Sequence, residues 1–246
     1  MIERDQTCHT TTPRRASQPD SAAELRANAY ALLSSLYQDQ PDRAAVQRFS
    51  TLWSSSDTTL AAGGLGQRTV EAGKQFCTAW QTGDGKLALQ LRREFALLFL
   101  SPLGGVHPFE SVYCGTRRRL MDEPWLEVRE FYREAGIEKG QQELHPEDHV
   151  AVELGFMAYL AFLESHCSTS SAADAALIEA TDTQRRFLDE HLIRWVPQLC
   201  RRIEAVPAAP YYHRVARFTS ALIEEDHARL SMPAEQLHNT WKEGSL

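Results

Sequence analysis

The stretch His145–His166, HPEDHVAVELGFMAYLAFLESH, decides the fold that this sequence predicts. Between Val150 and Leu163 only Glu153 is charged, so no polar face repeats along the segment. A helix that is apolar all round is normally buried, and we therefore expect this helix at the centre of a bundle. Its apolar run would rise about 21 Å at 1.5 Å per residue. That is shorter than the roughly 30 Å of hydrocarbon that a membrane-spanning helix must cross.

The beginning of this helix is marked by three residues. Pro146 suits the first helical position, where its missing N–H group costs nothing. Glu147 and Asp148 would place negative charge at the positive end of the helix dipole. The sequence therefore predicts a helix that begins at Pro146.

The rest of the chain shows helical spacing of apolar residues and no competing strand pattern. The other predicted helices cover residues 21–38, 41–53, 65–81, 86–100, 117–135, 175–205 and 211–230. Pro197 should kink or split the longest of them, and residues 168–173 look like a linker of small polar residues. The predicted fold class is all-α, a single-domain bundle of about eight or nine helices over residues 21–230. A disordered tail at 1–20 and a loose tail at 231–246 would flank it.

Composition narrows the class of protein further. The chain has 246 residues, 43% of them hydrophobic, and a formal net charge of −7. Without a basic stripe, nucleic acid and anionic lipid are poor partners, whereas a target that carries positive charge is favoured. The five cysteines are widely spaced and form no C-x-x-C pair, which argues against a disulfide framework and a zinc site. They indicate reduced thiols in a cytoplasmic protein.

Arg14 and Arg15 form a twin arginine that could be mistaken for an export signal. An export signal needs an apolar region directly afterwards. Here Asp20, Glu24 and Arg26 follow, so we interpret this segment as part of a polar tail.

Helical periodicity disappears in residues 101–115, SPLGGVHPFESVYCG. The segment holds two prolines and three glycines, but it also carries several large apolar residues. A loop of this composition is too hydrophobic to be only solvated. We expect it to lie against the body of the protein or to form a binding surface.

His145, His149 and Glu153 have the i, i+4, i+8 spacing of potential metal ligands on one helical stripe. Three ligands from a single helix rarely close a site, and no second helix offers the Glu-x-x-His pair of a di-iron bundle. A second interpretation is that Asp148 and His149 cap the helix while Glu153 pairs with an arginine. The interpretation that we favour is an exposed polar rim of a groove. A helical metal-binding protein or enzyme that uses these three residues is the alternative function.

Other signs of catalysis are weak. The chain lacks the phosphate-binding G-x-x-x-x-G-K-[ST] pattern and the G-x-S-x-G elbow. Ser111 could be a nucleophile with His107 or His149 as its base, but a serine near a histidine is common by chance. We expect no enzymatic activity, and the sequence predicts no cofactor and no metal of its own.

Two stretches of the chain form recognisable motifs. The first is Glu94–Phe99 followed by Pro102 and then by Pro108–Tyr113, PFESVY. The second is Pro146–His149, PEDH, at the start of the apolar helix. Together, in this order and spacing, they resemble the TorD/DmsD/NarJ family of molybdoenzyme-specific chaperones, also called redox enzyme maturation proteins, and the resemblance covers roughly residues 22 to 230. The chain departs from the family pattern in its Ser-Pro-Leu at 101–103, where many members have Gly-Pro, and in its longer N-terminal tail.

The resemblance implies a cytoplasmic chaperone that is not an enzyme. Such a protein binds the twin-arginine leader and the apo catalytic subunit of a molybdopterin-dependent oxidoreductase, and it assists cofactor insertion and assembly before export. Weak binding of a guanine nucleotide is also associated with the family, but no residue of this sequence indicates where a nucleotide would bind.

The expected groove would combine carboxylates for the arginines of a leader with apolar side chains for its apolar stretch. The predicted peptide-binding residues are Glu94, Phe99, Pro108, Phe109, Glu110, Ser111, Val112, Tyr113, Pro146, Asp148, His149 and Glu153. The first eight come from the helix and loop at 94–113, and the last four come from the start of the apolar helix. We therefore expect these two segments to lie side by side and to form an opening.

Overall fold

The structure, a computed structural model, describes residues 22–39, 43–55, 65–82, 87–101, 105–138, 140, 143–166 and 171–232. The tail predicted at 1–20 and nearly all of the one predicted at 231–246 lie outside this part of the chain. The elements are α1 (Ala22–Gln38), α2 (Arg43–Ser55), α4 (Gln67–Thr82), α5 (Leu87–Phe95), η1 (Ala96–Leu100), α6 (Glu110–Cys114), α7 (Glu123–Glu134), α8 (Val150–His166), α9 (Ser171–Phe187), η2 (Leu188–Leu192), α10 (Ile193–Glu204) and α11 (Pro210–Leu230). The elements η1 and η2 are π-helical.

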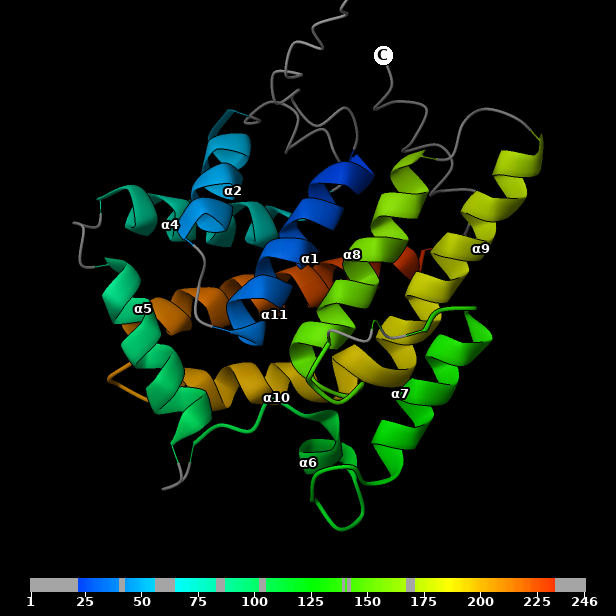
Figure 1. The fold of residues 1–246 in the computed structure, drawn as a ribbon. Helices are drawn as coiled ribbons and strands as arrows, with labels where there is room; N and C mark the ends of the chain where they lie inside the picture. The colour runs from blue at the N-terminus through cyan, green and yellow to red at the C-terminus, as the bar shows by residue number, and fades with distance from the viewer. Residues whose placement is uncertain are drawn as a thin grey trace, which may run out of the picture.

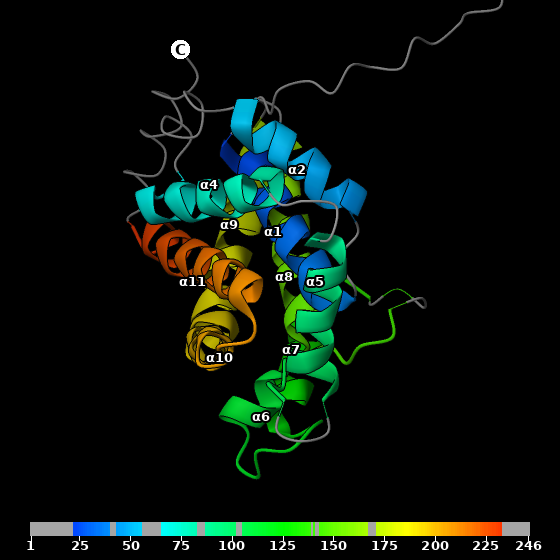
Figure 2. The same ribbon diagram turned by 90° about the vertical axis from the view of Figure 1, so that its left-hand side faces the viewer.

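The predicted all-α class is confirmed, since the described residues contain helices and no strand. Figure 1 shows α1, α8 and α9 running roughly side by side, whereas α4, α11 and α10 cross behind them. Figure 2 shows the second group stacked as a separate layer. An aromatic contact of Tyr37 on α1 with Tyr212 on α11 joins the two layers, and Phe49 on α2 contacts Phe218 on α11. None of the described helices combines the length and apolarity that crossing a membrane requires.

The structure corrects several predicted boundaries. The helix α8 begins at Val150 and not at Pro146, and α9 begins inside the predicted linker. The helix predicted at 117–135 is reduced to α7, because Arg118 and Met121 adopt positive φ angles of 49° and 55° that a right-handed helix cannot contain. The predicted helix at 175–205 is split at η2 and not at Pro197, which lies inside α10. The predicted loop contains the short helix α6.

The central position of α8 is confirmed only in part. It packs against α1 and α9, and Leu154, Met157 and Leu160 are buried in the core. However, Tyr159 and Phe162 are 47% and 48% exposed. The prediction that α8 is buried all round is therefore wrong, because its neighbours among the described elements cover only part of its circumference.

The far end of α8 is fixed by a buried ionic network. The Arg26 guanidinium of α1 lies 2.5 Å from a Glu164 oxygen of α8 and 3.4 Å from an Asp226 oxygen of α11. Tyr30 donates its hydroxyl hydrogen to Asp226 at 3.0 Å. The positive charge of Arg26, together with Arg229, lowers the pKa values of both carboxyls against the opposing effect of burial. The charges at this end of α8 are therefore balanced.

Candidate functional site

The two motif segments lie directly against each other, as predicted. Phe109 and His149 form an isolated antiparallel bridge. The Glu110 N–H donates to the Asp148 carbonyl at 2.9 Å, and the Val150 N–H donates to the Pro108 carbonyl at 2.9 Å. We call the contact between residues 108–111 and 148–150 the clasp. It joins the loop before α6 to the first residue of α8.

One side-chain pair closes the clasp. The Asp148 carboxylate accepts hydrogen bonds from the Ser111 N–H at 3.1 Å and from the Ser111 hydroxyl at 2.5 Å. The Ser111 oxygen in turn accepts from the Asp122 N–H at 3.2 Å. Burial raises the pKa of Asp148, and the hydrogen bonds from Ser111 act in the opposite direction. Asp148 therefore fixes the start of α6, a helix too short to be stable alone.

His149 caps α8. Its Nδ1 accepts a hydrogen bond from the Ala151 N–H at 3.1 Å, so it satisfies one of the free donors in the first turn of the helix. Burial, with a smaller effect of His145, lowers the pKa of His149 to about 3. The neutral ring that results is the form that can accept at Nδ1. The capping interpretation is thus confirmed for His149.

The interpretation that we favoured, an exposed polar rim, is wrong for two of its three residues. His149 is only 2% exposed and Glu153 is 0% exposed. His145 precedes α8 and stacks on His149 with ring centroids 4.0 Å apart. In the part of the chain that the structure describes, no three His, Cys, Asp or Glu side chains form a group that could hold a metal ion. This geometry does not support the alternative function based on these residues.

Three carboxyls are buried at the clasp and in the first turns of α8, and we call them the acid cluster. They belong to Glu110, Asp148 and Glu153. A Glu110 oxygen lies 3.0 Å from Nδ1 of His191. Glu153 accepts from the Trp195 indole N–H at 3.0 Å, and not from an arginine as one interpretation expected. One oxygen of each carboxyl has no hydrogen-bond partner among the described residues. Unlike the far end of α8, this end therefore has more buried acidic side chains than basic partners for them among the described residues.

Burial raises the pKa values of Glu110 and Glu153. The negative charge of Glu110 raises the pKa of Glu153 further, whereas His191 acts against the rise at Glu110. The acid cluster therefore favours a protonated form, because two buried carboxylates this close cannot both ionise without a large cost.

Two predicted site residues lie elsewhere. A Glu94 oxygen accepts from the N–H groups of Tyr211 and Tyr212 at 3.0 and 3.1 Å, so Glu94 caps the first turn of α11. The Phe99 ring packs edge-on against Tyr37 and Tyr212. Their contacts are with α11 and α1 and not with the clasp.

An opening lies beside the clasp. A pocket of about 240 Å³ begins at Ala151, in the first turn of α8, and lies between α8, α1, α7 and the segment before α8. Its lining includes Tyr132, Ile137, Val152 and Tyr159. The same side of α8 continues into the exposed rings of Tyr159 and Phe162. The pocket and this exposed face of α8 form an apolar surface, which we call the α8 surface.

Sequence reasoning missed three residues of the site: Asp122, His191 and Trp195. His191, in η2, and Trp195, in α10, lie 81 and 42 positions from their partners in the sequence. No local pattern could have indicated them. Asp122 was detectable, because an aspartate before Glu-Pro is typical of a helix start.

The clasp yields a first prediction. Asp148→Ala should lower the free energy of unfolding by about 2 kcal/mol, because the Ser111 N–H and hydroxyl lose a charged acceptor inside the protein. Urea unfolding of this variant, of Ser111→Ala and of the double variant measures the coupling. We expect the double variant to lose clearly less than the sum of the single losses. Simple additivity would show that the two side chains do not interact.

The acid cluster yields a second prediction, on pH. The folded-state pKa of Glu153 is raised, so its contribution to stability is greatest at acidic pH and falls as pH rises above the ordinary value of 4.5. Glu153→Gln should therefore stabilise the protein at alkaline pH and flatten this fall. Glu164→Gln on the same helix is the matched control. The pKa of Glu164 is lowered, so this change should destabilise the protein at neutral pH and less at acidic pH. Equal effects of Glu153→Gln and Glu164→Gln on the pH dependence of stability would contradict this account.

Comparison with known proteins identifies the family. The family described as "Nitrate reductase delta subunit" matches residues 64–201. The chain is 30% identical to the chaperone protein TorD of Vibrio cholerae serotype O1 (strain M66-2) over 61% of this chain and 66% of that protein, just under two thirds of its length. It is 28% identical to the chaperone protein TorD of Photobacterium profundum over 84% of this chain and 94% of that one.

A third relative is the selenate reductase assembly chaperone protein of Thauera selenatis, which is 26% identical over 87% of this chain and 94% of its own length. All three relatives are named as chaperones and none as an enzyme. The resemblance inferred from the two motifs is confirmed. The chain belongs to the nitrate reductase delta subunit family, which includes the TorD chaperones.

Proposed function

We propose that this chain is a cytoplasmic chaperone dedicated to one molybdenum-containing oxidoreductase. It binds the twin-arginine leader and the apo catalytic subunit, and it holds them until the cofactor is inserted and export can proceed. Family membership supports the chaperone role. The name of the relative from Thauera selenatis, an assembly chaperone for selenate reductase, supports a client of the oxidoreductase class.

The observation that carries the proposal is the position of the α8 surface. The clasp fixes the first turn of α8, and the apolar pocket begins in that same turn, at Ala151. A leader has an apolar stretch that forms a helix when bound, and laying such a helix in an apolar groove is a common mode of recognition. An uncovered apolar face on an acidic protein is therefore a suitable receptor.

The predicted peptide-binding residues then take two roles. Phe109, Val112 and Pro146 are half-buried at the edge of the clasp, and they can contact a peptide directly. The remaining members, apart from the half-buried Phe99, are buried. These members act by holding the clasp, the acid cluster and the start of α11 in place.

Carboxylates for the leader's arginines are available near the pocket. Glu143 lines it and accepts from the amide group of Gln38 at 2.7 Å. Glu147 lies beside the clasp and accepts from the Trp125 indole N–H at 2.6 Å. A carboxylate beside the pocket can form charge-assisted hydrogen bonds to an arginine of the leader. Nucleotide binding stays a prediction that this proposal does not need.

A titration tests the proposal. Fluorescently labelled leaders from the molybdoenzymes of the source organism are added to the protein, and anisotropy is measured at low and high salt. We expect one leader to bind with micromolar affinity that weakens as salt increases. Replacing its two arginines by glutamine should weaken binding roughly tenfold or more.

Variants locate the site. Tyr159→Asp should weaken binding of that leader by roughly tenfold, because it places a charge on the apolar surface. Ile178→Asp on α9, where Ile178 is also exposed, is the matched control and should bind as the parent does. If both variants bind equally well, the leader binds at another part of the protein. If no leader binds, the proposed function is wrong.

A further inference from the structure

The segment that joins α6 to α7 lies at one end of the molecule. Figures 1 and 2 both show it beyond the helices, below α6. Residues 116–121 of this segment read TRRRLM, three consecutive arginines followed by two apolar residues. We call these six residues the basic loop. None of them belongs to the clasp, the acid cluster or the α8 surface.

The base of the basic loop is held by Asp122. The buried Asp122 carboxylate accepts hydrogen bonds from the backbone N–H and the side-chain Nε of Arg117, both at 2.9 Å. A Cβ atom on Gly115 would lie 2.5 Å from the Ser111 carbonyl oxygen, so the chain can leave α6 this closely only at a glycine. The body of the protein therefore fixes the shape of the loop. A partner does not have to order it on binding.

The tip of the basic loop presents its side chains to solvent. Arg118 and Arg119 are exposed, and Leu120 and Met121 are 53% and 56% exposed. Among the described residues, the ion pairs of the loop are those that Arg117 makes with Asp122 and Glu123. The guanidinium groups of Arg118 and Arg119 therefore keep their N–H donors for a partner.

The backbone at this tip is strained. Arg118 and Met121 have φ angles of 49° and 55°, a region that costs energy for residues other than glycine. Strain of this kind is often found where a segment binds a partner. It keeps two arginines and two apolar side chains together at the outermost part of the loop.

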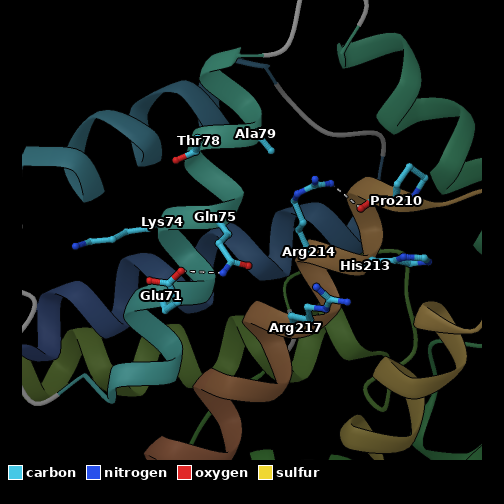
Figure 3. A pocket seen from close by; sticks show the side chains of 9 residues that line it. All are labelled: Glu71, Lys74, Gln75, Thr78, Ala79, Pro210, His213, Arg214 and Arg217. Atoms are coloured by element: carbon cyan, nitrogen blue, oxygen red, sulfur yellow. Dashed lines mark hydrogen bonds between the residues drawn. The ribbon is translucent and has the colours of Figure 1, made fainter.

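The combination of charge and apolarity distinguishes the basic loop from another positive region of the protein. The pocket between α4 and α11 is lined by Lys74, Arg214 and Arg217, among other residues (Figure 3). Its lining contains no large apolar side chain. In the basic loop, by contrast, Leu120 and Met121 follow the arginines directly.

We propose that the basic loop docks on the surface of a lipid bilayer that contains anionic phospholipids. Arginine donors match the phosphate oxygens of lipid headgroups, and basic residues are attracted by the negative potential of such a surface. Leu120 and Met121 enter the boundary between the headgroups and the acyl chains, where apolar side chains become buried. An acidic protein surface would need a cavity for these two side chains, whereas a bilayer accepts them anywhere.

The proposal departs from the expectation, drawn from net charge, that anionic lipid is a poor partner. The chain carries −7, so an anionic bilayer repels the protein as a whole. A loop that projects beyond the helices makes the contact while the acidic body stays outside the bilayer. Docking through one short loop is weak and reversible, since even a single acyl chain gives only marginal membrane binding.

Cosedimentation of the full chain with lipid vesicles at low salt tests this proposal. The probes are vesicles of equal parts phosphatidylglycerol and phosphatidylcholine, and vesicles of phosphatidylcholine alone. We expect binding to the anionic vesicles that weakens as salt increases, and much weaker binding to phosphatidylcholine. Combining Arg118→Gln with Arg119→Gln should weaken binding about thirtyfold, because each basic residue near an anionic surface contributes about fivefold. Combining Leu120→Gln with Met121→Gln should weaken it roughly tenfold.

The matched control combines Arg214→Gln with Arg217→Gln, the two arginines drawn in Figure 3. It changes the net charge of the protein by the same amount, but at a different surface, and should bind vesicles as the parent does. Circular dichroism checks the folding of every variant. The basic loop is exposed, so its four substitutions should leave the fold intact.

Any of four results would overturn the proposal. The first three are no binding of the parent to anionic vesicles, equal binding to both kinds of vesicle, and equal losses in the loop arginine variant and the control. The fourth is binding of soluble polyglutamate that the loop variants lose, without binding to vesicles, since the loop would then dock on an acidic polypeptide. The proposal is independent of the chaperone function, because leader binding is measured without lipid and at the α8 surface.

Discussion

The hydrogen bonds between the Asp148 carboxylate and Ser111 are the interaction on which the site depends. They join two segments that are far apart in the sequence, and they lie entirely inside the protein. The helix α6 has only five residues, so its position is set by this carboxylate and by the backbone bridge of Phe109 with His149. The same bridge places His149 where it caps α8. The buried residues of the two family motifs are therefore architectural, and a partner would meet the surfaces that they position.

The two ends of α8 differ in their electrostatics. Glu164 at the far end is neutralised by Arg26. Glu153 at the clasp end accepts a hydrogen bond from an indole N–H, and the negative charge of Glu110 acts on it. Burial therefore favours the protonated form of Glu153, whereas Glu164 is ionised beside Arg26. The clasp end of α8 is also the end beside the apolar pocket.

Much of the architecture could be predicted from the sequence. The helices α1, α4 and α11 begin and end within about two residues of their predicted bounds, because amphipathic spacing and flanking Pro or Gly define them. The adjacency of the two motif segments was also predicted correctly. The exposed face of α8 was not, because an unbroken apolar run does not indicate how much of the helix its neighbours cover. The start of α7 was missed because the positive φ angles of Arg118 and Met121 leave no trace in hydrophobic periodicity.

The sequence predicted many of the residues of the candidate site but not that most of them are buried. Spacing placed His149 and Glu153 near an opening, yet it could not show that their side chains turn inward toward Ala151 and Trp195.

Hydrogen–deuterium exchange of the free protein tests the central claim most directly. If the clasp is buried and stably formed, the amides of Glu110, Ser111 and Val150 exchange as slowly as the core of α8. A bound leader should then slow exchange near the α8 surface and not at these three amides. Fast exchange of these three amides in the free protein would contradict the account.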